Sequence, residues 1–225
     1  MRIGYHCEGK DKRVLHRLTC RLLDVDEDAT TAESTRQEDI SWPELLKMAH
    51  DSVVTLLSRG MDLIIVVADN DGSPKPGCGE DPEHPRHWLH TAAGAHSRPG
   101  CRCCDLVSAA TVPGKSPVVV CVAVEAIEAW LIVARGIAKG NPEDLSAESR
   151  GPGVALKLAF YGRKRVPLSR VTRRAVPLVK ALPDIRQIGL HSRSFRMFMD
   201  DIDAAGEVLR STGVLPSPPP APRSR

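Results

Sequence analysis

Three carboxylates follow segments that have the composition of buried strands. Glu8 follows the segment RIGYHC, and Asp69 and Asp71 follow the aliphatic run Leu63–Ala68. Residues i and i+2 of an extended chain point the same way, and the strands of an open α/β sheet present their carboxyl ends to one crevice. We therefore expect Glu8, Asp69 and Asp71 to converge.

Carboxylates packed together repel one another, so such a cluster needs a cation. Mg²⁺ (or Mn²⁺) fits, because it prefers hard oxygen ligands and keeps waters that leave room for a substrate phosphate. Asp69 and Asp71 would be ligands, Glu8 a ligand or a general base, and Lys10 a partner for a phosphate oxygen. The alternative for Asp-Asn-Asp-Gly is a plain turn, which favours the same residues.

Glu125 and Glu128 could supply a second acidic group near the same edge. They follow the aliphatic run at residues 117–124, and a spacing of three places them on one side of a helix turn. The alternative is an exposed helix face or a favourable interaction with the helix dipole.

The elements that must hold these residues alternate between strand and helix. Strands are expected at residues 2–7, 63–68 and 117–124, and helices at 11–23, from Ser41 to Leu57, and from about Glu125. A further strand between the first two helices is expected at LLDVD, residues 22–26. This order predicts an α/β domain with a mainly parallel sheet flanked by helices.

The chain is expected to form one main domain with additions. The α/β domain takes residues 1–150 and contains a Cys/His-rich insertion at 73–114, and a basic helical extension at 151–212 packs on it. There, short helices are separated by Pro167, Pro177 and Pro183, and the Pro-rich tail at 213–225 is expected to be disordered.

A strand ending in Glu-Gly and a later strand ending in Asp-x-Asp resemble the TOPRIM domain of topoisomerases, primases and overcoming-lysogenization-defect (OLD) nucleases. More narrowly, four blocks resemble, in order, the landmarks of a TOPRIM-like bacterial family known as domain of unknown function 4276. They are EGKDKRVLHRL, IIVVADNDG, VEAIEAWLIVA and HSRSFRMFM.

The resemblance implies a Mg-dependent fold for cutting or joining phosphodiesters, with relatives encoded near ATPases in mobile or antiphage-defence contexts. The matched residues are Glu8, Asp69, Asp71, Glu128 with Ala129-Trp130, and Ser194-Phe195-Arg196. One departure is at the first motif: the family continues as Glu-Gly-x-Thr-Glu, whereas here Lys10-Asp11-Lys12 follows Gly9.

The insertion is rich in zinc-binding residue types, although it lacks the paired Cys-x-x-Cys of ribbons and fingers. Structural zinc is one interpretation, and a flexible loop or a His-lined substrate groove are the others. The expected ligands are Cys78, His84, His87, Cys101 and Cys104. Cys7, Cys20 and Cys121 lie in apolar patterns and are expected to be buried.

Positive charge gathers in the C-terminal third. Residues 150–183 carry nine Lys or Arg and no acid, which suits either a solvated surface or a track for phosphates. Arg193 and Arg196 flank Ser194 at the start of the last expected helix, where backbone donors and guanidinium groups can hold phosphate. The candidate nucleic-acid contacts are Arg163, Lys164, Arg165, Arg173, Arg174, Arg193 and Arg196.

We expect a cytoplasmic protein. The chain does not open with a signal-peptide core, and Glu125 and Glu128 interrupt its longest apolar run. Its seven Cys residues suit a reducing compartment.

The leading hypothesis for the function is a metal-dependent nuclease acting on DNA or RNA, with an ATPase or a second copy of the chain as further partners. One alternative is a noncatalytic TOPRIM-like module that docks a partner or senses a nucleotide. Another is a receiver-like phosphotransfer domain.

Overall fold

The computed structural model describes residues 1–7, 12–35, 42–70, 116–124, 127–141, 144–145, 153–165 and 167–216. Within these residues lies an all-parallel sheet of strand order β2-β1-β3-β4. The strands are β1 (Arg2–His6), β2 (Thr31–Ser34), β3 (Leu63–Asn70) and β4 (Val118–Val124).

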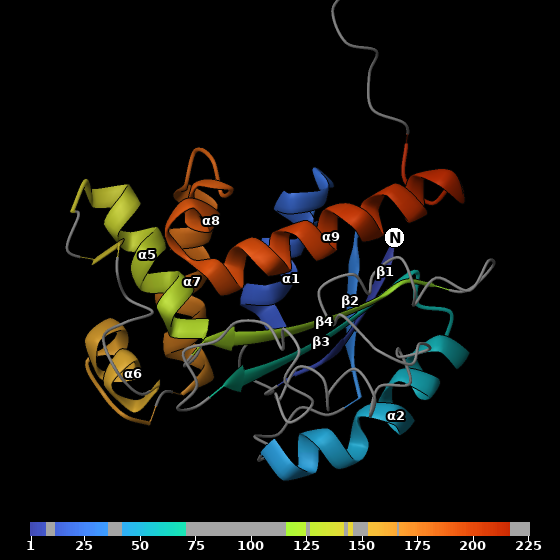
Figure 1. Ribbon diagram of the computed structural model, residues 1–225, viewed down its shortest axis with the longest axis horizontal. Helices are drawn as coiled ribbons and strands as arrows, with labels where there is room; N and C mark the ends of the chain where they lie inside the picture. The colour runs from blue at the N-terminus through green and yellow to red at the C-terminus, as the bar shows by residue number, and fades with distance from the viewer. Residues whose placement is uncertain are drawn as a thin grey trace, which may run out of the picture.

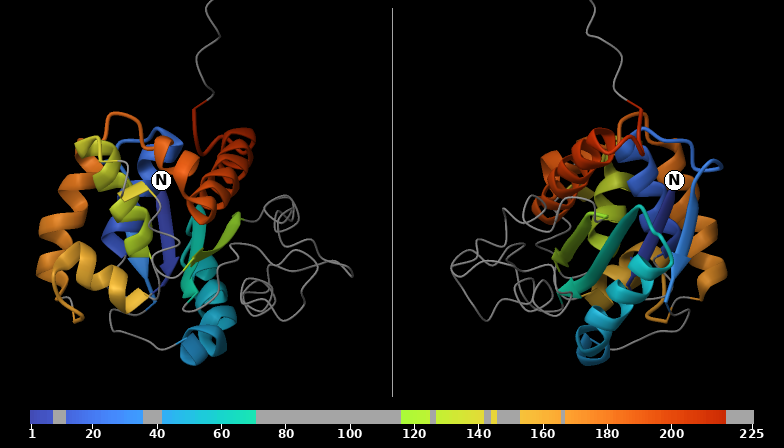
Figure 2. Two further views of the ribbon diagram at one scale, coloured as in Figure 1. Left: turned by 60° about the vertical axis from the view of Figure 1, so that its left-hand side comes forward. Right: turned by 90° about the vertical axis from the view of Figure 1, so that its right-hand side faces the viewer.

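Helices cover both faces of this sheet, as Figures 1 and 2 show. α2 lies on one face, and α1, α5, α7 and α9 lie on the other side. Their bounds are α1 (Lys12–Leu23), α2 (Trp42–Ser58), α5 (Ile127–Lys139), α6 (Gly153–Tyr161), α7 (Leu168–Ala181), α8 (Gln187–His191) and α9 (Arg193–Ser211). The predicted fold class, a parallel α/β sheet with further helices at its C-terminal end, is confirmed.

Strand side chains alternate between two apolar clusters, as the period of two in a strand requires. The odd-numbered residues of β3 from Leu63 to Val67 face the larger cluster, which α1, α5, α7 and α9 complete. Ile64, Val66 and Ala68 face the smaller cluster under α2. Because both faces are buried, β3 and β4 are continuous aliphatic runs.

The helices after residue 152 share the larger cluster with the sheet. Val171, Ala175 and Val179 of α7 pack in it, and so do Ile202 and Leu209 of α9. α7 lies against α1, and α9 lies against β4 and α1. Among the residues that the structure describes, no helix is both long and apolar enough to cross a membrane.

The position predicted for the second strand is wrong. Residues 22 and 23 of the expected segment belong to α1, where both leucines are buried, and Asp24 ends the helix with a positive φ of 55°. The actual strand is β2, whose sequence TAES is polar and partly exposed. β2 pairs only with β1 in the described sheet, so it carries little of the apolar signal that marks a central strand.

The prediction for Pro177 is wrong, whereas the prediction for three buried cysteines is confirmed. Pro177 does not separate two helices but lies inside α7, on its exposed side, where water can satisfy the carbonyl that loses its partner. Cys7, Cys20 and Cys121 are buried, with exposed fractions of 4%, 1% and 2%, as predicted.

An aromatic junction fixes the start of α5 against the start of α9. Trp130 stacks on Phe198 at a centroid distance of 5.4 Å and meets Phe195 edge-to-face at 5.3 Å. The indole Nε1–H of Trp130 donates to Ser194 Oγ at 2.7 Å, and both residues are fully buried. Since the two partners lie 64 residues apart in sequence, this junction connects the C-terminal helices to the helix that follows β4.

The substitution Phe198→Ala should lower the free energy of unfolding by about 3–5 kcal/mol, because it opens a cavity against Trp130 that cannot collapse fully. Urea unfolding measures the loss. Leu190→Ala is the control, since Leu190 is 69% exposed and its truncation should change stability by less than about 0.5 kcal/mol. Equal losses in the two variants would show that the junction does not stabilise the fold.

Candidate functional site

The register of the sheet brings the ends of three strands to one edge. His6 of β1 pairs with Val66 of β3, so β3 extends beyond β1, and Asp69 is the second-last residue of β3. Asp69 pairs with Ala123, next to the last residue of β4. The carboxyl ends of β1, β3 and β4 therefore lie at the same edge of the sheet.

Most of the predicted acidic residues come directly after these strand ends, where the structure does not describe the chain. Glu8, Lys10, Asp71 and Glu125 lie outside the described residues, and Asp69 is placed through its backbone. The convergence of the carboxylates therefore stays a prediction, whereas the adjacency of the strand ends is observed.

Glu128 is the acid nearest to this edge in sequence whose side chain the structure describes. It lies in the first turn of α5, four residues after β4 ends, and only 5% of it is exposed. The helix dipole favours a carboxylate in a first turn. Its neighbour Trp130 forms the aromatic junction with Ser194, so two of the blocks singled out in the sequence meet in the fold.

The start of α9 uses its polar groups within the fold. Ser192 caps the helix by accepting a hydrogen bond from the Phe195 backbone N–H at 3.1 Å. Ser194 is fully buried and accepts from Trp130, and Arg196 Nε donates to the Gly189 carbonyl at 2.8 Å. Part of the Arg196 guanidinium thus fixes α8 to α9, while Arg193 at the first position of α9 is exposed.

The basic segment forms a connected surface at the α6–α7 corner. Arg163, Lys164 and Arg165 lie exposed between the two helices, and Arg173 and Arg174 lie exposed on α7. Arg174 donates to the Phe160 carbonyl at 2.9 Å, which holds its side chain against the end of α6.

Arg170 belongs to the same surface, although its place there was not predicted from the sequence. It donates to the Tyr161 carbonyl at 2.7 Å. Partial burial, together with the charges of Arg163, Arg174 and Arg173, lowers the pKa of the Arg170 guanidinium. The spacing of three and four residues from Arg170 to Arg173 and Arg174 was the signal available in the sequence.

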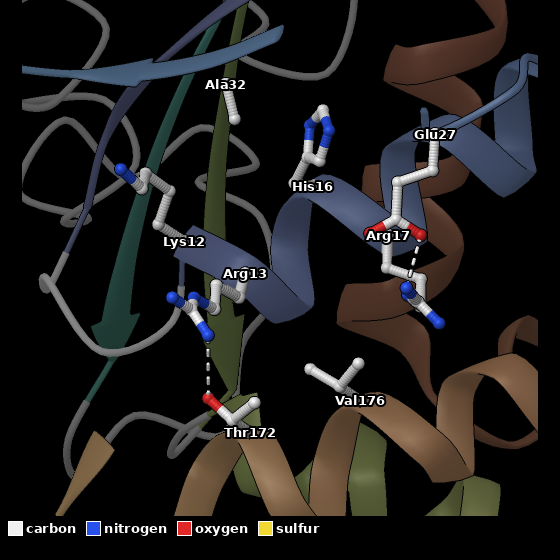
Figure 3. Close-up of a pocket in the computed structure, with 8 residues that line it drawn as sticks. All are labelled: Lys12, Arg13, His16, Arg17, Glu27, Ala32, Thr172 and Val176. Atoms are coloured by element: carbon white, nitrogen blue, oxygen red, sulfur yellow. Dashed lines mark hydrogen bonds and ion pairs between the residues drawn. The ribbon is translucent and has the colours of Figure 1, made fainter. Parts of the chain in front are cut away.

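A pocket of about 290 Å³ lies between α1, α7 and the segment around β2 (Figure 3). Its walls carry both charged and apolar groups: Lys12, Arg13, His16, Arg17, Glu27, Ala32, Thr172 and Val176. The sequence did not predict this site, because Thr172 and Val176 are about 150 residues or more from α1 along the chain and only the packing of α7 on α1 brings them there.

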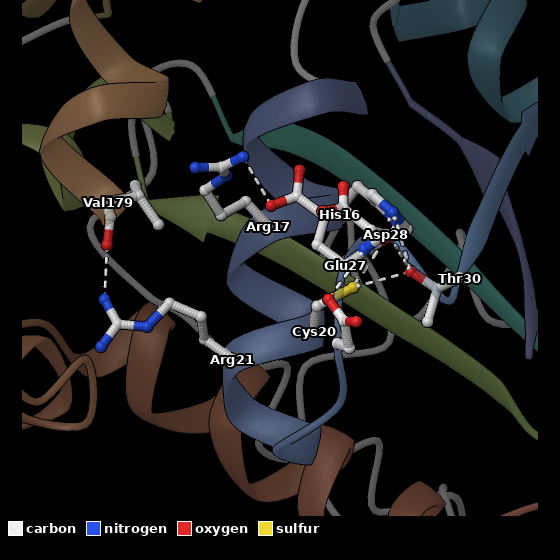
Figure 4. A network of polar contacts seen from close by, with 9 residues as sticks. His16, Arg17, Cys20, Arg21, Glu27, Asp28, Thr30 and Val179 are labelled. Carbon is white, nitrogen blue, oxygen red and sulfur yellow. Dashed lines mark hydrogen bonds and ion pairs between the residues drawn. The ribbon is translucent and has the colours of Figure 1, made fainter. Parts of the chain in front are cut away.

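His16 lies under this pocket in a network of buried hydrogen bonds (Figure 4). Thr30 Oγ1 donates to the Glu27 carbonyl at 2.9 Å, so it accepts from His16 Nε2–H at 3.1 Å. In the neutral tautomer with its proton on Nε2, His16 Nδ1 accepts from the Tyr5 hydroxyl at 3.2 Å. In this arrangement His16 is neutral and Tyr5 is protonated.

The electrostatics of the network agree with these protonation states. Burial lowers the pKa of His16 below its ordinary value and raises the pKa of Tyr5 well above its own. Burial also raises the pKa of the Cys20 thiol, whose sulfur lies 3.3 Å from Thr30 Oγ1. His16 is therefore a neutral structural group with both ring nitrogens occupied.

The predicted zinc ligands Cys78, His84, His87, Cys101 and Cys104 lie outside the described residues. Within the described part of the chain, no group of three or more His, Cys, Asp or Glu is placed to hold a metal ion. The zinc and magnesium sites both stay predictions.

Comparison of the chain with models of protein families found no match, and searches of curated proteins and of solved structures also found none. The likeness to the TOPRIM-like family therefore rests on the motifs quoted from the sequence.

Lowering the pH from about 7 to about 5 should reduce the free energy of unfolding. The unfolded His16 takes up a proton near its ordinary pKa of about 6.5, whereas the folded His16 has a lowered pKa. Its contribution to stability is thus complete above about pH 6.5 and is lost as the pH falls toward the folded pKa. One histidine contributes a slope of at most about 1.4 kcal/mol per pH unit.

Urea unfolding between about pH 5 and pH 7 measures this slope. His16→Gln should have a smaller slope than the unsubstituted protein, and His191→Gln, at an exposed position, should keep the original slope. An unchanged slope in His16→Gln would contradict the assignment of His16 as a buried neutral group.

Proposed function

We propose that this protein is a metal-dependent nuclease that hydrolyses phosphodiester bonds at the carboxyl edge of its sheet. The observation that carries the proposal is the neighbouring, parallel placement of β1, β3 and β4. Each strand end is followed within a few residues by a carboxylate, which is Glu8 after β1, Asp71 after β3 and Glu125 after β4. Asp69 belongs to the end of β3 itself.

In this mechanism Glu8, Asp69 and Asp71 would hold Mg²⁺ or Mn²⁺, which would supply charge neutralisation at the phosphoryl oxygens and an activated water. Glu8 binds the metal or acts as a general base, and Lys10 neutralises a phosphate oxygen. Glu128, buried in the first turn of α5, contributes a second acidic group to the same edge.

The nucleic acid would contact the exposed cations of the α6–α7 corner through its backbone. Arg163, Lys164, Arg165, Arg173 and Arg174 are all exposed, and exposed aromatic side chains for stacking on bases are absent from the described α6–α7 corner, where Phe160 and Tyr161 are buried. Phosphate contacts of this type give affinity without sequence specificity.

Purified protein incubated with Mg²⁺ or Mn²⁺ should cleave at least one of supercoiled DNA, single-stranded DNA and tRNA. Glu8→Gln and Asp69→Asn should each lower the rate by on the order of 10²-fold or more, because each removes a charge that the metal or the attacking water requires. Gel electrophoresis of the products measures the rate.

The matched controls make the same chemical changes at exposed positions elsewhere. Glu207→Gln on α9 and Asp51→Asn on α2 should cleave at the original rate. If Glu8→Gln and Asp69→Asn cleave all substrates as fast as these controls, the nuclease proposal is wrong. Loss of metal binding in Asp69→Asn, without cleavage by any variant, would instead favour a noncatalytic binding module.

The double variant Lys164→Gln with Arg165→Gln should bind nucleic acid more weakly and with a shallower salt dependence. Each cation that neutralises a phosphate contributes roughly one unit to the slope of log K against log [NaCl]. The double variant should therefore lower that slope by about one to two units. Fluorescence anisotropy with a labelled duplex over a range of NaCl concentrations measures it.

The control double variant is Lys47→Gln with Lys139→Gln, which removes two exposed cations from α2 and from the end of α5. It should keep the slope of the unsubstituted protein. Equal slopes in the two double variants would mean that the α6–α7 corner does not contact the backbone.

A further inference from the structure

We propose that the pocket between α1 and α7 binds a phosphate group. The site goes beyond the proposed nuclease activity, because it uses none of the acidic residues of the sheet edge and requires no metal ion. It is the pocket of about 290 Å³ that Figure 3 shows, with α1 on one side and α7 on the other.

The charge of the pocket favours an anion. Lys12, Arg13 and Arg17 line it, and the single carboxylate among the lining residues is Glu27. Glu27 already pairs with Arg17 at 2.5 Å, and His16 is neutral. Among the described residues the charges of Lys12 and Arg13 are thus left unpaired by a carboxylate, and together they match the double negative charge of a phosphate monoester.

Most donors of these two cations have no partner among the described residues. Arg13 makes one long contact, to Thr172 Oγ1 at 3.4 Å, and within the described residues Lys12 has no salt bridge or hydrogen bond. A guanidinium has five N–H donors and an ammonium has three. Thr172 adds a hydroxyl from α7, so donors reach the pocket from two helices.

The position of the two cations on α1 is a second indication. Lys12 and Arg13 occupy the described first turn of α1, which has no acidic residue, and Asp11 precedes the described helix. Cations at a helix N-terminus are disfavoured by the helix dipole. An anion bound there interacts favourably with the dipole and with both side chains, which accounts for basic residues at this end.

The size of the pocket limits the ligand. About 290 Å³ is at the lower end of the range for small-molecule sites, so it suits a phosphate or diphosphate group rather than a whole dinucleotide. The remaining walls, Ala32 and Val176, are apolar and carry no side-chain acceptor that would compete for the cations. The phosphate could belong to a free nucleotide or to the end of a nucleic acid strand.

Calorimetry with inorganic pyrophosphate tests the site, in EDTA and at about 150 mM NaCl so that weak surface attraction is screened. The protein should bind pyrophosphate with a Kd below about 1 mM. Lys12→Gln with Arg13→Gln should weaken binding by roughly tenfold or more, because it removes two charge-assisted hydrogen bonds. The control Lys47→Gln with Lys139→Gln removes the same charge elsewhere and should bind normally.

Thr172→Asp is a second variant that keeps both cations. Its carboxylate would pair with Arg13 across the 3.4 Å contact and repel the ligand, so it should also weaken binding roughly tenfold. Thermal unfolding verifies that each variant is folded. No binding of pyrophosphate at millimolar concentration, or unchanged binding in both Thr172→Asp and the Lys12/Arg13 variant, would overturn the proposal.

Two further ligands identify the source of the phosphate. Stronger binding of a 5′-phosphorylated oligonucleotide than of its 5′-hydroxyl form would assign the pocket to strand ends, and equal binding of the two, with ADP bound tightly, would assign it to a free nucleotide. Asp69→Asn should bind pyrophosphate as the unsubstituted protein does. The failure of the nuclease proposal and the failure of the phosphate pocket are therefore separate results.

Discussion

The parallel direction of all the described strands is the constraint on which the rest of the structure depends. A parallel pair cannot be joined by a tight hairpin, so its connection must cross over, as α1 does between β1 and β2 and α2 does between β2 and β3. This requirement places α1 and α2 over the faces and sends every strand end to the same edge. Functional residues that follow β1, β3 and β4 in sequence therefore start from the same edge of the sheet, where ligands of open α/β sheets generally bind.

The helices that follow the sheet in sequence complete the face that the crossovers leave open. α7 packs on α1, and α9 packs on β4 and α1, so their apolar stripes join the core of the strands. The Trp130–Ser194 hydrogen bond and the stacked ring of Phe198 fix the angle at which α9 approaches α5. The pocket between α1 and α7 exists because this later layer brings Thr172 and Val176 of α7 beside the first helix.

The strands and helices predicted correctly were those with strongly apolar patterns over a short stretch of sequence. β3 and β4 are uninterrupted aliphatic runs, and α2 and α9 have apolar stripes at helical spacing. β2 could not be located in this way, because its four residues are polar and half-exposed, and Pro177 was misjudged because exposure lets a helix tolerate it. The contact between Arg13 and Thr172 depends on how α7 packs on α1. The sequence pattern of either helix alone does not predict that packing. Asp69 was placed correctly at a strand end, since an aliphatic run that stops at an acid marks the edge of a sheet.

β4 is the last strand of the described sheet, and α9, which covers it, is the most distant helix from it along the chain. During synthesis the strand VVVCVAV therefore leaves the ribosome well before its cover. In that interval its aliphatic side chains and unpaired backbone groups have the composition that promotes association between chains. Correct assembly of this protein would thus be sensitive to the rate of translation and to chaperones that shield nascent segments.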